Sequence, residues 1–492
     1  MNMDKAKNRE KILSEKDSLQ KKTLSGAVWS SLEKFSAQGI SFLVMIVMAR
    51  ILTPTDYGLV GMVLIFVHIA LSLVDCGFSQ ALIRKQDRTE LDNNTAFYFN
   101  IVVGVILYAV MWFIAPAVSE FYRQPRLVWI MRAICLGILF NSFVVVQRAL
   151  LTVEIDFKTQ AKASIYAAAT GGVIGIWMAY KGLGVWSIVA YHIINFFLNT
   201  LFLWIYSNWR PMLQFSWKSF SELFGFGSKL AASGLIHTLY NNAYIMVIGK
   251  FFQAADLGFY SRADQFAKFL SLNISNVLQR VTFPVLCRFQ DDNEKLSEVF
   301  LKFIRATSFI IIPLMAGMAA VSKPFILALL GDKWLFVADL LPILCFSGML
   351  ANVYTINQNI LLVKGRSDLF LRLEIFKKIF FVLVIVAAIP LGLLALCWAQ
   401  VINSVIEVIV NSFYTKKLIG ISIWKQLKSL VSTFIYSFSM AIVVWIVTLL
   451  LKNCWLQLFA GVGTGLIFFY LICYLTRSKD LRLVLGIIKR KF

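Results

Sequence analysis

Two stretches of ten residues decide the fold: Arg50–Leu59, with the sequence RILTPTDYGL, and Lys250–Phe259, with the sequence KFFQAADLGF. Both contain, without a gap, a cation, two apolar residues, a polar residue, two small or turn-forming residues, an Asp, an apolar residue, a Gly and an apolar residue. Each copy closes one long apolar segment and opens the next. A second correspondence aligns Gln147–Leu150 with Gln358–Leu361. These repeats predict a chain built from two related halves.

The composition predicts an integral membrane protein. Of 492 residues, 59% are hydrophobic and 15% are charged, and the mean hydropathy is +0.74. A membrane-spanning helix needs about 20 mostly apolar residues. Fourteen stretches meet this need, at roughly 24–49, 58–83, 94–119, 127–151, 159–180, 183–207, 219–249, 257–286, 297–321, 336–362, 367–389, 392–415, 427–451 and 455–476. We therefore expect an all-α protein with about 14 transmembrane helices, whose short connections leave no room for a soluble domain.

The net charge of +22 raises the possibility of a nucleic-acid partner, but its distribution favours a membrane. Lys and Arg concentrate in both terminal segments and in every second loop, at Arg84, Lys85, Arg88, Arg148, Lys158, Lys162, Arg210, Lys218, Arg288, Lys295, Lys364, Arg366, Lys416, Lys417, Lys425 and Lys428. Basic loops mark the cytoplasmic side of a membrane protein. Both termini are expected in the cytoplasm, as an even helix count also requires. Residues 1–23 form a basic tail without the pattern of a signal peptide.

The cysteines and histidines give no sign of a metal site or a disulfide framework. The seven cysteines stand singly, almost all inside apolar segments, and no CxxC motif occurs. The three histidines, His68, His192 and His237, are equally dispersed. We expect neither a metal nor another cofactor.

Polar side chains form stripes on single faces of four of the predicted helices. Charged groups are costly inside a bilayer, so they usually face a cavity or a partner. The stripes comprise Ser30, Lys34, Gln38 and Ser41 on the first helix; His68, Ser72, Asp75 and Ser79 on the second; Lys229, Ser233, His237, Tyr240 and Tyr244 on the seventh; and Asp264, Lys268, Ser271 and Ser275, with Arg262, Gln265, Asn273 and Asn276, on the eighth. Matching stripes in the two halves predict a hydrated cleft between them.

Simpler structural roles compete with this interpretation. Asp264–Lys268 and Glu374–Lys378 have the i,i+4 spacing of intrahelical ion pairs. Arg262 and Lys229 stand where a long side chain could extend to the membrane interface instead of a cleft. Two further arginines lie within a turn or two of predicted helix ends and fit either an interfacial or a buried role: Arg132 and Arg305.

Three segments carry a resemblance to a known family: Thr23–Phe66, Val74–Asp87 (VDCGFSQALIRKQD) and Ala255–Phe266 (ADLGFYSRADQF). The chain resembles bacterial polysaccharide exporters of the multidrug/oligosaccharidyl-lipid/polysaccharide (MOP) flippase superfamily, in particular the branch of lipopolysaccharide and colanic-acid exporters. The likeness covers nearly the whole chain. Its motifs are packing and turn signatures rather than chemical ones.

The resemblance implies two pseudo-symmetric six-helix lobes, followed by two helices that offer an apolar groove for a polyprenyl tail. These parts are the N-lobe (24–208), the C-lobe (218–417), helices 13 and 14 (426–476) and a basic cytoplasmic tail (477–492). It also implies a cationic cavity, which Lys34, Arg262 and Lys268 would line, while Glu33 and Asp264 depart from the cationic pattern.

The resemblance further implies a flippase that carries a polyprenyl-diphosphate-linked oligosaccharide across the bacterial cytoplasmic membrane, with no bond-forming activity. A polysaccharide polymerase and glycosyltransferases are the partners it suggests, and a monomer is expected. The residues expected to bind the substrate are Lys34, Gln38, Arg262, Lys268, Lys229, Asn273 and Asn276. The alternative is a cation-coupled multidrug antiporter of the same superfamily, for which the candidate ion or proton sites are Asp75 and Glu407.

Overall fold

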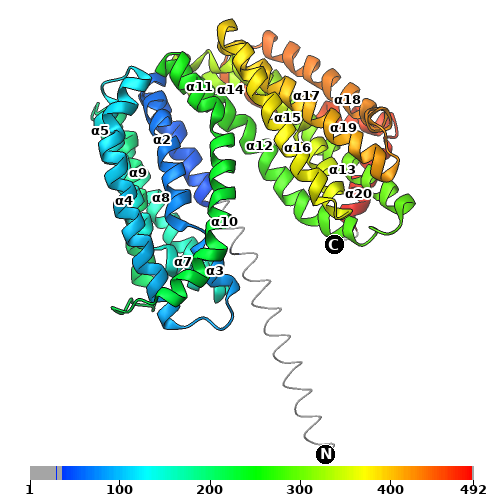
Figure 1. The fold of residues 1–492 in the computed structure, drawn as a ribbon. Coiled ribbons are helices and arrows are strands. Elements are labelled where there is room, and N and C mark those ends of the chain that lie inside the picture. The colour runs from blue at the N-terminus through cyan, green and yellow to red at the C-terminus, as the bar shows by residue number, and fades with distance from the viewer. Residues whose placement is uncertain (1–28, 30–35, 490–492) are drawn as a thin grey trace, which may run out of the picture. The chain divides into compact units, whose positions relative to one another are not determined.

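The computed structural model describes Trp29 and residues 36–489, without the side chains of residues 272–281, 485 and 487–489. Within these residues the regular elements are all helices (Figure 1). Nine helical segments among them are long and apolar enough to cross a membrane: α2–α3 (Pro54–Arg84), α4 (Glu90–Tyr122), α8 (Phe157–Tyr180), α9 (Val185–Tyr206), α13 (Asn293–Ala320), α15 (Val337–Val363), α17 (Leu393–Ile419), α18 (Ile423–Leu450) and α19 (Cys454–Leu475). The predicted all-α membrane fold is confirmed.

A tenth span is broken in the middle. Helices α5 (Leu127–Ile134) and α6 (Leu136–Ser142) continue into α7 (Val145–Val153) after a bend of 43°. The sequence predicts one continuous span here, at 127–151. The three helices cover almost the same residues, from Leu127 to Val153, so the predicted bounds are close. The hydropathy of the segment does not reveal the bend.

Four more predicted spans are helical but less apolar or shorter in the described part. They are the helix Ser36–Ile51, α10 (Trp217–Asn241) with α11 (Ala243–Phe251), α12 (Ala254–Cys287) and α16 (Ser367–Ala388). Helices α10, α12 and α16 carry charged residues that the sequence places inside the membrane, among them Lys229, Asp264, Lys268, Glu374 and Lys377. The total of 14 spans stays a prediction.

The chain divides into two compact units, Met1–Leu257 and Gly258–Phe492. In the first unit, α8 packs along α9, and α10 packs on α2, α3 and α4. In the second unit, α13 packs on α15 and α18, α15 packs on α17, and α19 packs on α18 and on α14 (Ser322–Leu329). Short 3-10 helices at Asp332–Trp334 and Ile389–Leu391 and the C-terminal helix α20 (Lys479–Lys489) complete this unit.

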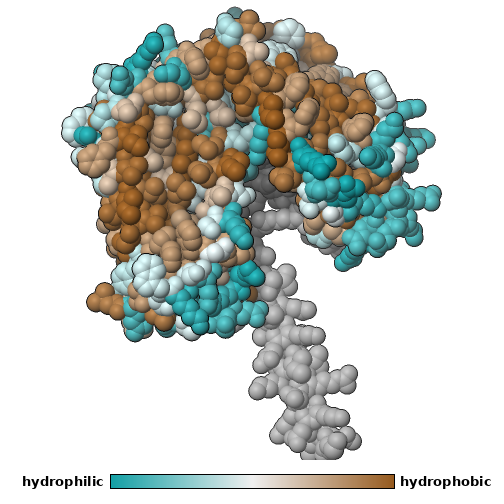
Figure 2. All heavy atoms as spheres, in the orientation of Figure 1, coloured by the Kyte–Doolittle hydropathy of each residue, from teal (hydrophilic) through white to brown (hydrophobic). Residues whose placement is uncertain are grey.

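Apolar side chains cover the helix faces of each unit (Figure 2). On α4, for example, Val102 is 55% exposed and Phe113 is 77% exposed. A protein that folds in water rarely exposes a large continuous apolar surface, so these side chains are expected to face lipid. The buried core of the second unit is also apolar, with Phe300 and Ile304 of α13 packed near Ile360 of α15.

The two copies of the repeated sequence form the same local structure. Thr53 N–H donates to the Asp56 carboxylate at 3.0 Å, and Asp56 N–H donates to Thr53 Oγ1 at 3.3 Å, at the start of α2. At the start of α12, Gln253 N–H donates to the Asp256 carboxylate at 3.1 Å. Each repeated Asp therefore satisfies a backbone N–H that the first helical turn leaves without a partner.

The repeated glycine of the first copy permits a close approach of two backbones. A Cβ on Gly58 would lie 1.7 Å from the carbonyl oxygen of Ala254, the first residue of α12. A similar contact joins the turn after α2 to α10, because a Cβ on Gly77 would lie 2.6 Å from the Gly227 carbonyl oxygen. Gly77 also has a φ of +69°, which favours glycine.

Replacing Gly58 tests the first of these contacts. We expect Gly58→Ala to destabilise the protein by about 2 kcal/mol, because the backbone of Ala254 cannot move aside as a flexible side chain could. Gly225→Ala on α10 is the matched control, since no atom lies within 4 Å of its new methyl group. The measurement is thermal unfolding of the purified protein in detergent. Equal unfolding temperatures for the two variants would contradict the contact.

Candidate functional site

The described residues among those predicted to bind the substrate lie on three helices. Gln38 on the helix Ser36–Ile51 and Lys229 on α10 are exposed in the first unit. Arg262 and Lys268 lie on α12 in the second unit, as does the backbone of Asn273 and Asn276, whose side chains are not described. Lys34 lies outside the described residues. Their joint role in binding stays a prediction.

The structure forms the ion pair that the spacing on α12 allows. Lys268 Nζ lies 2.8 Å from the Asp264 carboxylate, and the two side chains are 44% and 13% exposed. The second carboxylate oxygen, Asp264 Oδ1, is buried and accepts no hydrogen bond within the described residues. Asp264 therefore partly neutralises Lys268, which remains accessible to a further anion.

Asp75 has a structural contact that its sequence position does not predict. Asp75 is the last residue of α2, and its carboxylate accepts a hydrogen bond of 3.0 Å from Ser79 N–H in the first turn of the following helix, α3 (Phe78–Arg84). Between the two helices, Cys76 and Gly77 adopt φ angles of 43° and 69°. The carboxylate thus stabilises the restart of the helix after this break.

A second polar cluster joins α15 and α16. Glu374 lies 2.5 Å from Lys377 Nζ and accepts a hydrogen bond of 2.8 Å from the Gln358 amide. The Lys377 side chain is only 5% exposed. Glu407, the other candidate ion site, lies on α17, which packs on α15 and α16. The sequence suggests Lys378 as the partner of Glu374, and the ion pair that the structure forms is instead with Lys377, one residue earlier.

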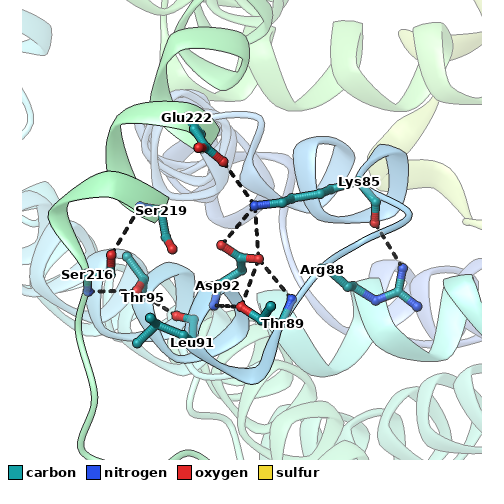
Figure 3. A network of polar contacts seen from close by, with 9 residues as sticks. All are labelled: Lys85, Arg88, Thr89, Leu91, Asp92, Thr95, Ser216, Ser219 and Glu222. Carbon is teal, nitrogen blue, oxygen red and sulfur yellow. Dashed lines mark hydrogen bonds and ion pairs between the residues drawn. The ribbon is translucent and has the colours of Figure 1, made fainter.

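A network of polar contacts that the sequence does not predict surrounds Lys85 in the first unit (Figure 3). Lys85 Nζ lies 3.0 Å from Asp92 and 3.0 Å from Glu222, so it joins the start of α4 to α10. Asp92 is 1% exposed and also accepts a hydrogen bond of 2.9 Å from Thr89 N–H. Lys85 is thus the cation that balances a buried carboxylate.

The electrostatics of this network favour the charged lysine. Burial of Lys85 opposes its charge, but its hydrogen bonds to Glu222 and Asp92 and the charges of both carboxylates outweigh that effect and raise the pKa of Lys85. A second contact joins the starts of α4 and α10, since Ser216 N–H donates a hydrogen bond of 3.1 Å to Thr95 Oγ1. The spacing of Thr89 and Asp92 is that of a capping box and could have located the start of α4, but it does not identify Lys85 as the partner of Asp92.

Within the described residues, no group of three or more His, Cys, Asp or Glu side chains is placed to hold a metal ion. The polar clusters are instead pairs and triads of opposite charge. The long apolar helices of the described part define a multi-pass membrane protein.

The chain belongs to the family described as polysaccharide biosynthesis protein, whose model matches residues 47–339. Similar proteins include TuaB, the teichuronic acid biosynthesis protein of Bacillus subtilis, which is 28% identical over 94% of this chain and 99% of TuaB. WzxC, a lipopolysaccharide biosynthesis protein of Escherichia coli, is 26% identical over 87% of this chain and 89% of WzxC. The predicted family is therefore confirmed.

Solved structures share the fold at low sequence identity. The lipid II flippase MurJ, in an inward closed conformation, superimposes with a TM-score of 0.71 at 13% identity, over 91% of this chain and 99% of MurJ. An inward-facing multidrug resistance transporter of the MATE family, in the MOP superfamily, gives a TM-score of 0.61 at 18% identity, over 80% of this chain and 98% of that protein. The chain shares its fold with both of these proteins, and the predicted fold is confirmed.

Replacing Lys85 tests the network in Figure 3. We expect Lys85→Met to destabilise the protein by about 3 kcal/mol, because it leaves the carboxylate of Asp92 buried without its cation. Glu222→Gln should cost less than about 1 kcal/mol, since the Glu222 side chain is 50% exposed. The measurement is again thermal unfolding in detergent. The double variant Lys85→Met/Asp92→Asn should recover part of the loss, and an equal or larger loss would contradict the assignment.

Proposed function

We propose that this protein is a flippase that moves an undecaprenyl-diphosphate-linked oligosaccharide from the inner to the outer leaflet of the bacterial cytoplasmic membrane. The observation that carries the proposal is the similarity to TuaB and WzxC over 94% and 87% of this chain. The fold shared with the lipid II flippase MurJ supports it. In this proposal the protein forms no covalent bond in its substrate.

The chemistry of such a substrate fits the predicted binding residues. A diphosphate needs cations, for which the candidates are Lys34, Lys229, Arg262 and Lys268. At an effective dielectric constant of about 20, one pair of opposite charges 4 Å apart contributes about 4 kcal/mol. The sugars need hydrogen-bonding groups such as those of Gln38, Asn273 and Asn276. Because Lys268 is 44% exposed beside Asp264, a diphosphate would compete with that carboxylate for the ammonium group.

The transport cycle that we propose is alternating access. The N-lobe (24–208) and the C-lobe (218–417) would open in turn to each side of the membrane, around a site between related halves. Helices 13 and 14 (426–476) would keep the polyprenyl tail in lipid. Both termini would lie in the cytoplasm, because the basic loops mark that side. The protein would act as a monomer, supplied by glycosyltransferases and followed by a polymerase.

Reconstituted transport tests the proposal. In proteoliposomes with a fluorescent undecaprenyl-diphosphate-linked sugar, the wild-type protein should move the probe between leaflets. The double variant Lys34→Ala/Lys268→Ala should be at least about tenfold slower, because two cations for the diphosphate are lost. Lys181→Ala, at the exposed turn between α8 and α9, is the control and should retain the wild-type rate. An unchanged rate in the double variant, or a new covalent product, would overturn the proposal.

The alternative function, a cation-coupled antiporter, is favoured by one specific observation, the intramembrane carboxylates Asp75 and Glu407. Asp75→Asn separates the two functions, because an Asn side chain retains the acceptor for Ser79 N–H and loses only the charge. We expect this variant to fold and to flip the lipid-linked probe at the wild-type rate. Cation-driven drug efflux that depends on Asp75 would establish the antiporter instead.

A further inference from the structure

Four cations gather where α4 ends and α5 begins in the first unit. Arg123 and Arg126 are exposed in the turn, and Arg132 lies on α5. Lys250 joins them from α11, since its Nζ lies 3.9 Å from the centroid of the Phe121 ring and 2.7 Å from the Phe121 carbonyl oxygen. This end of α4 is opposite to the end that carries Lys85 and Asp92. The distribution of basic loops predicts that this end of α4 lies on the non-cytoplasmic side of the membrane, where Lys and Arg are usually scarce.

Arg132 is held between two indole rings. Its guanidinium carbon lies 4.4 Å from the ring centroid of Trp112 on α4 and 5.2 Å from that of Trp129 on α5. These cation–π contacts fix the guanidinium plane but satisfy none of its N–H donors. Arg132 Nε is buried and makes no hydrogen bond to any residue that the structure describes.

The helices around Arg132 supply no carboxylate for it. α5 packs on α2, α4 and α9. On α4 no acidic residue occurs between Asp92 and Glu120, and α5, α6 and α9 contain none. The two carboxylates of α2 are engaged at its ends, Asp56 with Thr53 and Asp75 with Ser79. Within the part of the chain that the structure describes, Arg132 has no carboxylate partner, so its counter-ion is expected from the surroundings of these helices.

The surroundings of Arg132 place that counter-ion in the lipid. Arg132 follows the first residue of α5 by about 7.5 Å along the helix axis, at 1.5 Å per residue. The headgroup layer on each side of a bilayer is about 5–7 Å thick. Trp129, three residues before Arg132 on α5, is 61% exposed, and Phe113, next to Trp112 on α4, is 77% exposed. At this depth, the anions beside an apolar surface are the phosphates of lipid headgroups.

We propose that Arg132, Trp112 and Trp129 form a binding site for the phosphodiester of an anionic bilayer phospholipid. The guanidinium donates hydrogen bonds to the phosphate oxygens, and the indole rings hold it in place and pack against the upper part of the acyl chains. Arg123, Arg126 and Lys250 add positive potential around the headgroup. This site lies on the lipid-facing surface of the first unit, so it is independent of the proposed transport function.

Native mass spectrometry of the purified protein tests the site directly. The wild-type protein should retain phosphatidylglycerol in preference to phosphatidylcholine with the same acyl chains. Arg132→Gln should bind phosphatidylglycerol about tenfold more weakly, the loss expected for one charge-assisted hydrogen-bonded contact. Arg132→Lys should fall between the two, because an ammonium keeps the charge but neither stacks on indole rings nor forms two parallel hydrogen bonds.

Lys181→Gln is the matched control, since it removes an exposed cation from the turn between α8 and α9 of the same unit. It should bind phosphatidylglycerol as the wild-type protein does. If Arg132→Gln does not fold, Arg132→Lys carries the comparison. Equal retention of phosphatidylglycerol by all variants, or equal retention of the two lipids, would overturn the proposal. Displacement of the lipid by millimolar inorganic phosphate or pyrophosphate would show a site for free anions and would also overturn it.

Discussion

Each helix that starts in a bilayer protein must find partners for its first backbone N–H groups, and here side-chain oxygens supply them. Asp56 and Asp256 serve this purpose in the two copies of the repeat, and Asp92 does so at the start of α4. Comparable contacts begin four other long helices, through Asp156, Ser216, Asp292 and Ser422. Where lipid excludes water, an unsatisfied N–H costs several kcal/mol. These caps fix the places at which the chain turns, and the packing of the helices follows from them.

Between the turns, helices associate through close backbone approach or through paired polar side chains. The contact of Gly58 with Ala254 is of the first kind. The second kind is clearest between α15 and α18, where the buried amides of Asn357 and Gln426 exchange hydrogen bonds of 2.8 and 3.1 Å. Apolar side chains alone gain little by leaving lipid for another helix, so such contacts select which helices pair. Lys85, with Asp92 and Glu222, does the same near the membrane surface.

The sequence predicts the local structure well and the distant contacts poorly. Apolar length and the repeated Asp locate most helices within a few residues, because both act on neighbouring positions. The spacing of Asp264 and Lys268 also predicts their ion pair correctly. The same i,i+4 spacing suggests Lys378 as the partner of Glu374, which is wrong, because Glu374 pairs with Lys377 and also accepts a hydrogen bond from Gln358 on another helix. The contact of Lys85 with Glu222 joins residues 137 positions apart, and no local pattern encodes it.

Helix α16 has a consequence for the synthesis of the protein. Its sequence includes Arg372, Glu374, Lys377 and Lys378, and each charge at the centre of an isolated helix opposes entry into lipid by about 2.5–3.5 kcal/mol. Gln358 on the preceding span lowers this barrier by binding Glu374, which already neutralises Lys377. The translocon is therefore expected to release α15 and α16 into the bilayer together, as a hairpin, rather than one after the other.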